Sequence, residues 1–526
     1  MNSIEALVAI ARRLTAIARI STVIVLMSFS ARAESPFCLL PPDPATPWLP
    51  TTPAPSETNV PAPRPASDCQ FYRPAWQQFL VATQPVGTSP AFLGYPSFEQ
   101  IFQPATAVSA KSKPGELLTL KLVPRNIQRP NDPNAGQQKL SDDIQAGIGG
   151  APGGNLIDQH GHFIYYAIHV NPAFLQFLQQ HNLTTVDGIK QLDSTLSSLT
   201  FLGSDADIAS GANTNVAEFK SAWMIVDGNN PPPTYFVVPA QIPHYVVNGN
   251  TLVQEVQNGK PVTDEVSVAL IALHVVFTLP GHPELIWSTF EHVHADKSGT
   301  VVRDNAPAAP DNPSNTPGTT VISTEDFPLY KANTPASGAN AALDLKTIVQ
   351  FWDTTKQAFV RPDGTSIQTS VYRPYPGSKT DGSAANPGHD EDDEVIATNN
   401  HATEMFADAM AKQVITDADK RQHYRLVGAI WLDQPASGAT PSFQVKRSFS
   451  IAANQSTDDV GQPLAGEGRL GSTAMESFTQ FEDGAPNCFS CHDTNAVRDQ
   501  RVLIKAARLN VSHILSKFID SQPAQP

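Results

Sequence analysis

The stretch Glu265-Val-Ser-Val-Ala-Leu-Ile-Ala-Leu-His-Val-Val-Phe-Thr-Leu279 and, shortly after it, Glu284-Leu-Ile-Trp-Ser-Thr-Phe-Glu-His-Val-His294 decide the fold class. Both are rich in the β-branched and aromatic residues typical of strands, and Pro280-Gly281-His282-Pro283 between them is a turn signal. The first stretch is apolar at consecutive positions over most of its length, as expected of a central strand covered on both sides. We therefore predict a sheet in the middle of the protein.

Weaker patterns surround these two strands. Further strands are predicted at Glu116–Val123, His162–Val170, Val216–Val226, Tyr235–Val238, Thr251–Gln257 and His423–Leu432. Helices are predicted at Pro74–Leu80, Pro172–Gln180, Ala402–Val414, Thr473–Gln480 and Ala496–Ile519, and surface loops at 303–341 and 373–395. This order predicts an α+β fold, with a large body that is β-rich in the middle and with helices toward the C-terminus.

The charge of the chain excludes one class of partner. The 526 residues include 35 Lys and Arg against 50 Asp and Glu, which gives a formal net charge of -15. A nucleic-acid partner is not expected, because no basic excess is available to displace the counterions of its phosphates.

Residues 1–33 have the pattern of a secretory signal peptide. Arg12, Arg13 and Arg19 precede the uncharged run 20–30, and the small-x-small triplet Ala31-Arg32-Ala33 follows. The run is short for a membrane span, and no later stretch approaches about 18 uninterrupted apolar residues. We expect export to the periplasm by the Sec route rather than the twin-arginine route, with an uncleaved anchor as the alternative.

Residues 34–71 are predicted to form a proline-rich strap. Ten prolines fall within residues 41–65, and proline at this density favours an extended tether over a helix or a central strand. Cys38 and Cys69 flank these prolines, and in an oxidising compartment they could close the strap as a disulfide. The remainder, residues 72–526, is predicted to be a single large body.

The strongest chemical signal is Cys488-Phe489-Ser490-Cys491-His492, the CxxCH attachment sequence of c-type haem. Each thiol can add to one haem vinyl group, and the adjacent His492 is then held under the iron as the proximal axial ligand. Thioether attachment takes place outside the cytoplasm, in agreement with the export signal. The alternatives are a redox disulfide of thioredoxin type and half of a structural zinc site. Neither has its usual surroundings in this sequence.

The position of the motif constrains the fold around the haem. Only 34 residues follow His492 (526 - 492), and none of them is methionine. A compact class I cytochrome module, in which a later methionine supplies the sixth ligand, therefore does not fit. We expect the main body to enclose one covalently bound haem c.

The sixth iron ligand has several candidates. His274 lies in a nearly all-apolar strand, where it is either a distal ligand or a hydrogen-bonded core histidine. His292 is an alternative; together with His294 it could also form a two-histidine metal pair, or both could be polar strand ends. His513, at the border of a helical apolar stripe, and Met475, thirteen residues before Cys488 and either a ligand or a core residue, complete the set. A vacant position would permit peroxide or small-ligand chemistry.

Several blocks carry a resemblance to a known family. They are Val266–Thr278, Glu284–His294, Tyr424–Trp431 and Leu470–Gln480, followed by the final CxxCH. Over most of residues 72–495 the chain resembles large exported bacterial proteins of the cytochrome c family that carry a single CxxCH near the C-terminus. Their recurring Trp-x-Thr-Phe-Glu-His-Val block is here Trp287–Val293.

The resemblance implies haem c and a periplasmic setting, but no particular substrate. One position departs from the family pattern, because Phe277 stands where relatives often carry a second histidine after the one that matches His274. A ligand role for that second histidine is therefore impossible in this chain.

The function expected from the sequence is electron transfer by an exported monohaem c-type cytochrome with a redox partner protein. The body is far larger than a simple carrier needs, so the alternatives are a haem-dependent oxidoreductase or peroxidase acting on a small-molecule substrate, and a haem-based sensor or binding protein. No membrane contact beyond the export signal is expected.

Overall fold

The structure is a computed structural model of the 526-residue chain. It describes residues 67–102, 155–190, 215–279, 282–295, 301–306, 318–339, 348–372 and 393–432, together with short pieces at 38–41, 45, 47–50, 120–121, 123–124, 343, 464–466, 472, 474–475, 512, 514–515 and 518. The chain divides into two units, Met1–Pro36 and Phe37–Pro526, and all of these residues belong to the second.

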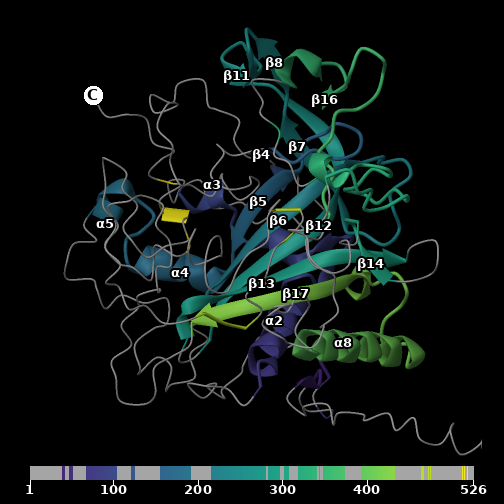
Figure 1. The fold of residues 1–526 in the computed structure, drawn as a ribbon. Helices are drawn as coiled ribbons and strands as arrows, with labels where there is room; N and C mark the ends of the chain where they lie inside the picture. Colours follow the sequence, from purple (N-terminus) through teal and green to yellow (C-terminus); the bar gives the residue numbers. More distant parts are fainter. Residues whose placement is uncertain are drawn as a thin grey trace, which may run out of the picture. The chain divides into compact units, whose positions relative to one another are not determined.

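A mixed sheet is built around β12 (Thr263–Leu279), the strand predicted to be central (Figure 1). Along one edge β12 pairs with β6 (Ala217–Val226), and along the other it pairs first with β7 (Val237–Pro243) and then with β13 (His282–Ala295). The sheet continues through β17 (Tyr424–Leu432), β18 (Leu464–Gly466), β5 (Tyr165–Val170), β4 (Val123–Pro124), β3 (Leu120–Lys121) and β14 (Val301–Arg303). The described pairs are antiparallel except β3 with β7.

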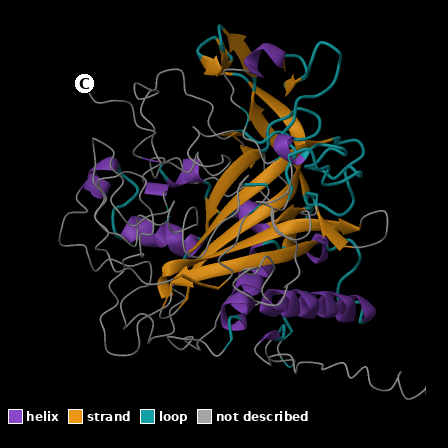
Figure 2. Cartoon of the chain, viewed as in Figure 1, coloured by secondary structure: helices purple, strands orange, loops and turns teal. Residues whose placement is uncertain are grey.

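The remaining described elements are short strands and helices around this sheet (Figure 2). The strands form the pairs β1 (Pro85–Val86) with β2 (Ser89–Pro90), β8 (Tyr245–Asn248) with β9 (Thr251–Gln254), β10 (Val256–Gln257) with β11 (Lys260–Pro261), and β15 (Trp352–Asp353) with β16 (Ala358–Phe359). The helices are α2 (Cys69–Ala82), α3 (Phe98–Ile101), α4 (Pro172–Gln180), α5 (Val186–Lys190), α8 (Asp393–Ala411), and the 3-10 turns η2 (Ala91–Gly94), η6 (Ala336–Gly338), η7 (Val349–Phe351) and η8 (Lys420–His423).

One face of the sheet, here called the α2 face, carries Leu273, Val275 and Phe277 of β12. It is covered by α2 and α8, which lie side by side below β13 and β17 in Figure 1. Phe79 of α2 stacks on Phe290 of β13 with ring centres 4.2 Å apart. These large apolar rings bury much of the surface that stabilises the fold.

The other face, here called the His274 face, carries the alternate β12 residues Ala272, His274 and Val276, because successive side chains of a strand point to opposite sides. An apolar cluster around Val276 includes side chains of α4. A second cluster lies around Ala272. Since both faces are covered, the prediction of a β-rich α+β body with a doubly covered central strand is confirmed.

Two helices begin earlier than predicted. α2 begins at Cys69 rather than Pro74, so it crosses the boundary expected at residue 72. α8 begins at Asp393 rather than Ala402, because the polar residues Thr398 and Asn399 favour a loop in isolation but are satisfied here. The Thr398 hydroxyl donates to the carbonyl of Glu394, and the Asn399 amide bonds to β17.

Among the described residues, no helix is both long and apolar enough to span a bilayer.

Candidate functional site

The haem-attachment residues Cys488, Cys491 and His492, and the candidate ligand His513, lie outside the described residues. The predicted signal peptide also lies outside them. The structure does describe the other three ligand candidates, His274, His292 and Met475. It also describes residues on either side of the motif in the sequence.

His274 occupies the centre of the His274 face and is buried. Its register partners are Lys220 on β6 and Thr289 on β13, which flank it directly across the sheet. The Nδ1 atom of His274 lies 2.7 Å from the hydroxyl oxygen of Thr289. This hydrogen bond fixes the imidazole plane, and it directs the second nitrogen, Nε2, away from Thr289.

Polar groups cluster around His274 on this face. Glu218 and Lys220 of β6 and Glu291 of β13 are all buried. Glu218 pairs in register with Val276, and Glu291 with Ala272, which places these carboxylates on either side of the histidine. Buried charged groups need partners within the protein. The hydroxyl of Ser512 donates to Glu218 over 2.6 Å.

The described residues that precede the motif pack on the His274 face. Met475 is fully buried in the cluster around Ala272, together with Tyr166 and Ala474. The hydroxyl of Tyr166 donates to the carbonyl of Ala474 over 2.7 Å. In this arrangement Met475 is part of the apolar core.

The described residues that follow the motif pack on the same face. Ile514 and Leu515 are buried in the cluster around Val276, and Phe518 stacks on Phe102 with ring centres 3.9 Å apart. The described segments on the two sides of the motif therefore contact the two clusters between which His274 lies.

His292 lies on the opposite face of the sheet, the α2 face, with Phe290 and Tyr424. Both of its ring nitrogens have protein partners, Nδ1 with Asp304 Oδ1 at 3.0 Å and Nε2 with the Thr234 hydroxyl at 3.1 Å. To bind a haem iron, His292 would have to give up one of these two hydrogen bonds. Its ring also stacks on that of Tyr235, with ring centres 3.5 Å apart.

Asp304 joins His292 and His294 in one group. His294 Nδ1 lies 3.1 Å from the same carboxylate oxygen, and the hydroxyl of Tyr235 donates to that oxygen over 2.9 Å. Burial alone would raise the pKa of Asp304, but the charges and hydrogen bonds of the two histidines outweigh it and hold this pKa below its ordinary value. Asp304 is therefore a carboxylate at neutral pH.

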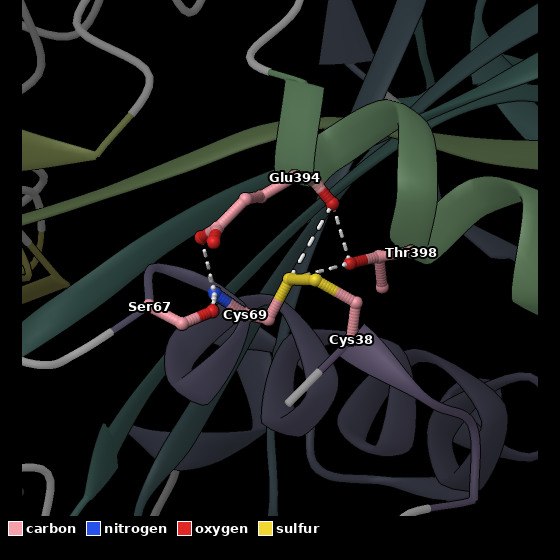
Figure 3. The surroundings of a disulfide bond; sticks show 5 residues. All are labelled: Cys38, Ser67, Cys69, Glu394 and Thr398. Carbon is pink, nitrogen blue, oxygen red and sulfur yellow. Dashed lines mark hydrogen bonds between the residues drawn. A yellow bond between two sulfur atoms is a disulfide. The ribbon is translucent and has the colours of Figure 1, made fainter. Parts of the chain in front are cut away.

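The disulfide expected between Cys38 and Cys69 is present, with its Cα atoms 4.9 Å apart (Figure 3). It lies between the start of α2 and the start of α8. The backbone N–H of Cys69 donates to the Glu394 carboxylate over 3.1 Å, and Cys69 Sγ lies 3.3 Å from the Thr398 hydroxyl. Because the two sulfur atoms are bonded to each other, Cys38, Cys69 and Glu394 do not form a metal site in this state.

Comparisons of the chain with models of protein families, with curated proteins and with solved structures give no match.

Sequence reasoning named the histidines but missed most of their partners. Thr289 and Glu291 belong to a strand that was predicted, and their position opposite β12 follows once the register of the hairpin is known. Asp304 fell within the predicted loop 303–341 and carried no motif. A carboxylate that follows two histidines by about ten residues is too common a pattern to indicate a contact.

Proposed function

We propose that this chain is an exported monohaem c-type cytochrome that transfers electrons, with Cys488 and Cys491 as thioether anchors and His492 as the proximal ligand. The CxxCH sequence carries the proposal, because few patterns are so closely tied to one cofactor. The N-terminal signal pattern supports it, since c-type haem is attached outside the cytoplasm. The disulfide between Cys38 and Cys69 is also in keeping with an oxidising compartment.

The packing around the motif supports enclosure of the haem by the His274 face. Met475 precedes Cys488 by 13 residues, and Ser512 follows His492 by 20. Both contact this face, on either side of His274. Contacts of both flanks with this face support a haem position near it, whereas an independent cytochrome module would need no such contacts.

His274 is the proposed sixth ligand. A histidine that binds a metal through one ring nitrogen commonly holds a protein group with the other, which sets its tautomer and orientation. Thr289 does this for Nδ1 of His274, so Nε2 is the nitrogen that would face the iron. When bound, haem c supplies an iron that gains or loses one electron. The protein contributes a fixed imidazole and a buried face that excludes water.

The charged residues around His274 suit a site that holds a charged group. Lys220 is its direct neighbour on β6, and Glu218 and Glu291 are close by on the same face. A cationic side chain near a haem favours the reduced iron, and a carboxylate favours the oxidised iron. The balance of these buried charges would therefore tune the potential of the site.

The decisive experiment is production of the chain together with a cytochrome c maturation system, followed by mass spectrometry of the periplasmic protein. We expect a mature chain that begins at Glu34 and carries the mass of one haem. The increment should be absent from the double variant Cys488→Ser/Cys491→Ser. A wild-type chain without the increment overturns the haem proposal.

Spectroscopy of the same protein tests electron transfer. We expect a low-spin ferric spectrum, reversible one-electron reduction, and no change on addition of CO or cyanide, as two protein ligands imply. A high-spin spectrum that responds to peroxide would support the oxidoreductase alternative instead. A spectrum that responds only to CO or another small ligand would support a sensor.

A further inference from the structure

Asp304 accepts more hydrogen bonds at one oxygen than at the other. His292 Nδ1, His294 Nδ1 and the Tyr235 hydroxyl all lie 2.9 to 3.1 Å from Oδ1. The second oxygen, Oδ2, is buried and has no hydrogen-bond partner. Only 4% of the Asp304 surface is exposed. A buried carboxylate oxygen without a partner is costly, and a group that is absent from the structure would relieve this cost.

We propose that His292, His294 and Asp304 bind a divalent transition-metal ion of the zinc class, in a site separate from the haem. Each residue offers one ligand atom, and the three atoms lie within 4.8 Å of one another. Two imidazole nitrogens and a carboxylate form a set that suits such ions, since imidazole selects them over calcium and magnesium.

The spacing of the ligand atoms fits an ion of this size. Ligands bound at about 2.1 Å lie about 3.0 to 3.4 Å apart when the angle at the metal is between about 90° and 109°. The two distances from histidine Nδ1 to Asp304 Oδ1, 3.0 and 3.1 Å, already fall in this range. The ion would therefore enter with small movements of the side chains.

The proton balance of the site is simple. Each histidine would bind the ion through Nδ1 as a neutral imidazole, with its ring proton on Nε2. At His292 this proton can be donated to the Thr234 hydroxyl, which lies 3.1 Å from Nε2. The Asp304 carboxylate offsets part of the charge of the ion.

The surrounding residues hold the ligands in place. The ring of Tyr235 stacks on that of His292 with centres 3.5 Å apart and an interplanar angle of 17°. Its hydroxyl also donates to Asp304 Oδ1 and so holds the carboxylate beside the two imidazoles. Outer groups of this kind orient the ligands of metal sites.

The site is open on one side. The His292 side chain is fully buried, whereas 26% of the His294 side chain is exposed. The ring of Phe327 lies 5.9 Å from that of His294, and Phe327 also lines a cavity of about 560 Å³. Three protein ligands and an exposed edge leave a coordination position for water or for a small ligand.

The test is titration of the haem-loaded protein with Zn²⁺, monitored by isothermal calorimetry. X-ray absorption at the zinc edge, which the haem iron does not affect, then identifies the ligands. We expect one equivalent of zinc with two imidazole ligands. His294→Gln removes one ligand at a partly exposed position and should weaken zinc binding by at least about tenfold. Thr234→Val should weaken it less, by up to about tenfold.

His181→Gln is the matched control, because it removes a surface histidine at the end of α4 and should leave zinc binding unchanged. Equal zinc affinity in wild type and His294→Gln overturns the proposal, as does wild type that takes up no zinc. The haem spectrum should be the same in all of these variants, so loss of zinc binding is distinguishable from failure of the haem proposal. Asp304→Asn would also weaken zinc binding, but it alters a buried group. If that variant folds poorly, His294→Gln still decides the question.

Discussion

His274 and His292 lie on opposite faces of one sheet, although they are 18 residues apart in the sequence (292 - 274) and belong to the adjacent strands β12 and β13. His274 shares its face with the residues that flank the CxxCH motif, and His292 shares the other with Asp304. His274, the first candidate ligand in the sequence, and His292, an alternative, therefore lie in different surroundings.

Replacement of His274 should change the spin state of the haem. We expect His274→Ala to convert a low-spin ferric spectrum to a high-spin one that binds CO on reduction, because the sixth ligand is lost. Thr289→Val removes only the hydrogen bond to Nδ1 and should shift the reduction potential without changing the spin state. Absorption and electron paramagnetic resonance spectra measure these effects.

The matched controls for this prediction are Met475→Leu and His292→Gln. Both leave the His274 hydrogen bond untouched, so neither should alter the spin state. A high-spin spectrum in either control, combined with an unchanged spectrum in His274→Ala, would refute the assignment of His274.

Removal of Asn399 should detach α8 from the sheet. Its side chain donates to the carbonyl of Leu426 over 2.8 Å and accepts from the N–H of Leu426 over 3.0 Å. Asn399→Ala leaves both buried backbone groups without these partners, so we expect a loss of about 2 to 4 kcal/mol in the free energy of unfolding. Urea denaturation measures it, with the neighbouring surface change Asn400→Ala as control. Equal stability of the two variants would contradict the prediction.

The disulfide between Cys38 and Cys69 should contribute measurably to stability. It closes a loop with a sequence separation of 31 residues, for which the chain-entropy model gives about 3 to 4 kcal/mol. We expect Cys38→Ser/Cys69→Ser to lower the free energy of unfolding by this amount. Because single replacements leave one free thiol, only the double variant is informative. An unchanged midpoint in urea would show that the N-terminal segment is not coupled to the sheet.

Acid should destabilise the protein through His169. Burial lowers its pKa from 6.5 to about 4, so between these pH values the unfolded chain binds a proton that the folded chain does not. Stability should fall as the pH falls from about 6.5 to 4, by up to about 3 kcal/mol from this residue. His169→Leu should flatten that part of the profile, and the exposed His160→Gln should not.

Two other groups add to the acid profile in different ways. Burial also lowers the pKa of His423 to about 4, so part of the slope should remain in His169→Leu. The pKa of Asp304 is held below its ordinary value of 3.8, and its contribution should therefore be lost only at lower pH. A slope confined to pH below 4 in the wild-type protein would contradict the assignment to His169.

The sequence predicts the sheet well because β12 and β13 are long, apolar and rich in β-branched residues. Runs of this kind rarely fit another secondary structure. The sequence does not predict the boundaries of α8, because Thr398 and Asn399 favour a loop until Glu394 and Leu426 supply their partners. The contacts of Asn399 link it to Leu426, which lies 27 residues away in the sequence. Local patterns carry no information about them.

The candidate site is likewise predictable from the sequence only in part. The alternation of side chains in β12 predicts which residues of that strand share a face with His274. Which helices cover that face depends on the whole fold. Asp304 reaches His292 and His294 because β14 turns back onto β13, where Val302 pairs with His294. That register is invisible in the loop composition of residues 303–341.

The buried disulfide implies an order of assembly. Neither Cys38 nor Cys69 has exposed surface in the folded protein, and Glu394 and Thr398 of α8 lie against the bond. An oxidant must therefore act before α8 docks. Translation proceeds from the N-terminus, so both thiols are made well before Glu394, which lies 325 residues after Cys69. Helix α8 then covers a disulfide between two residues that were made much earlier.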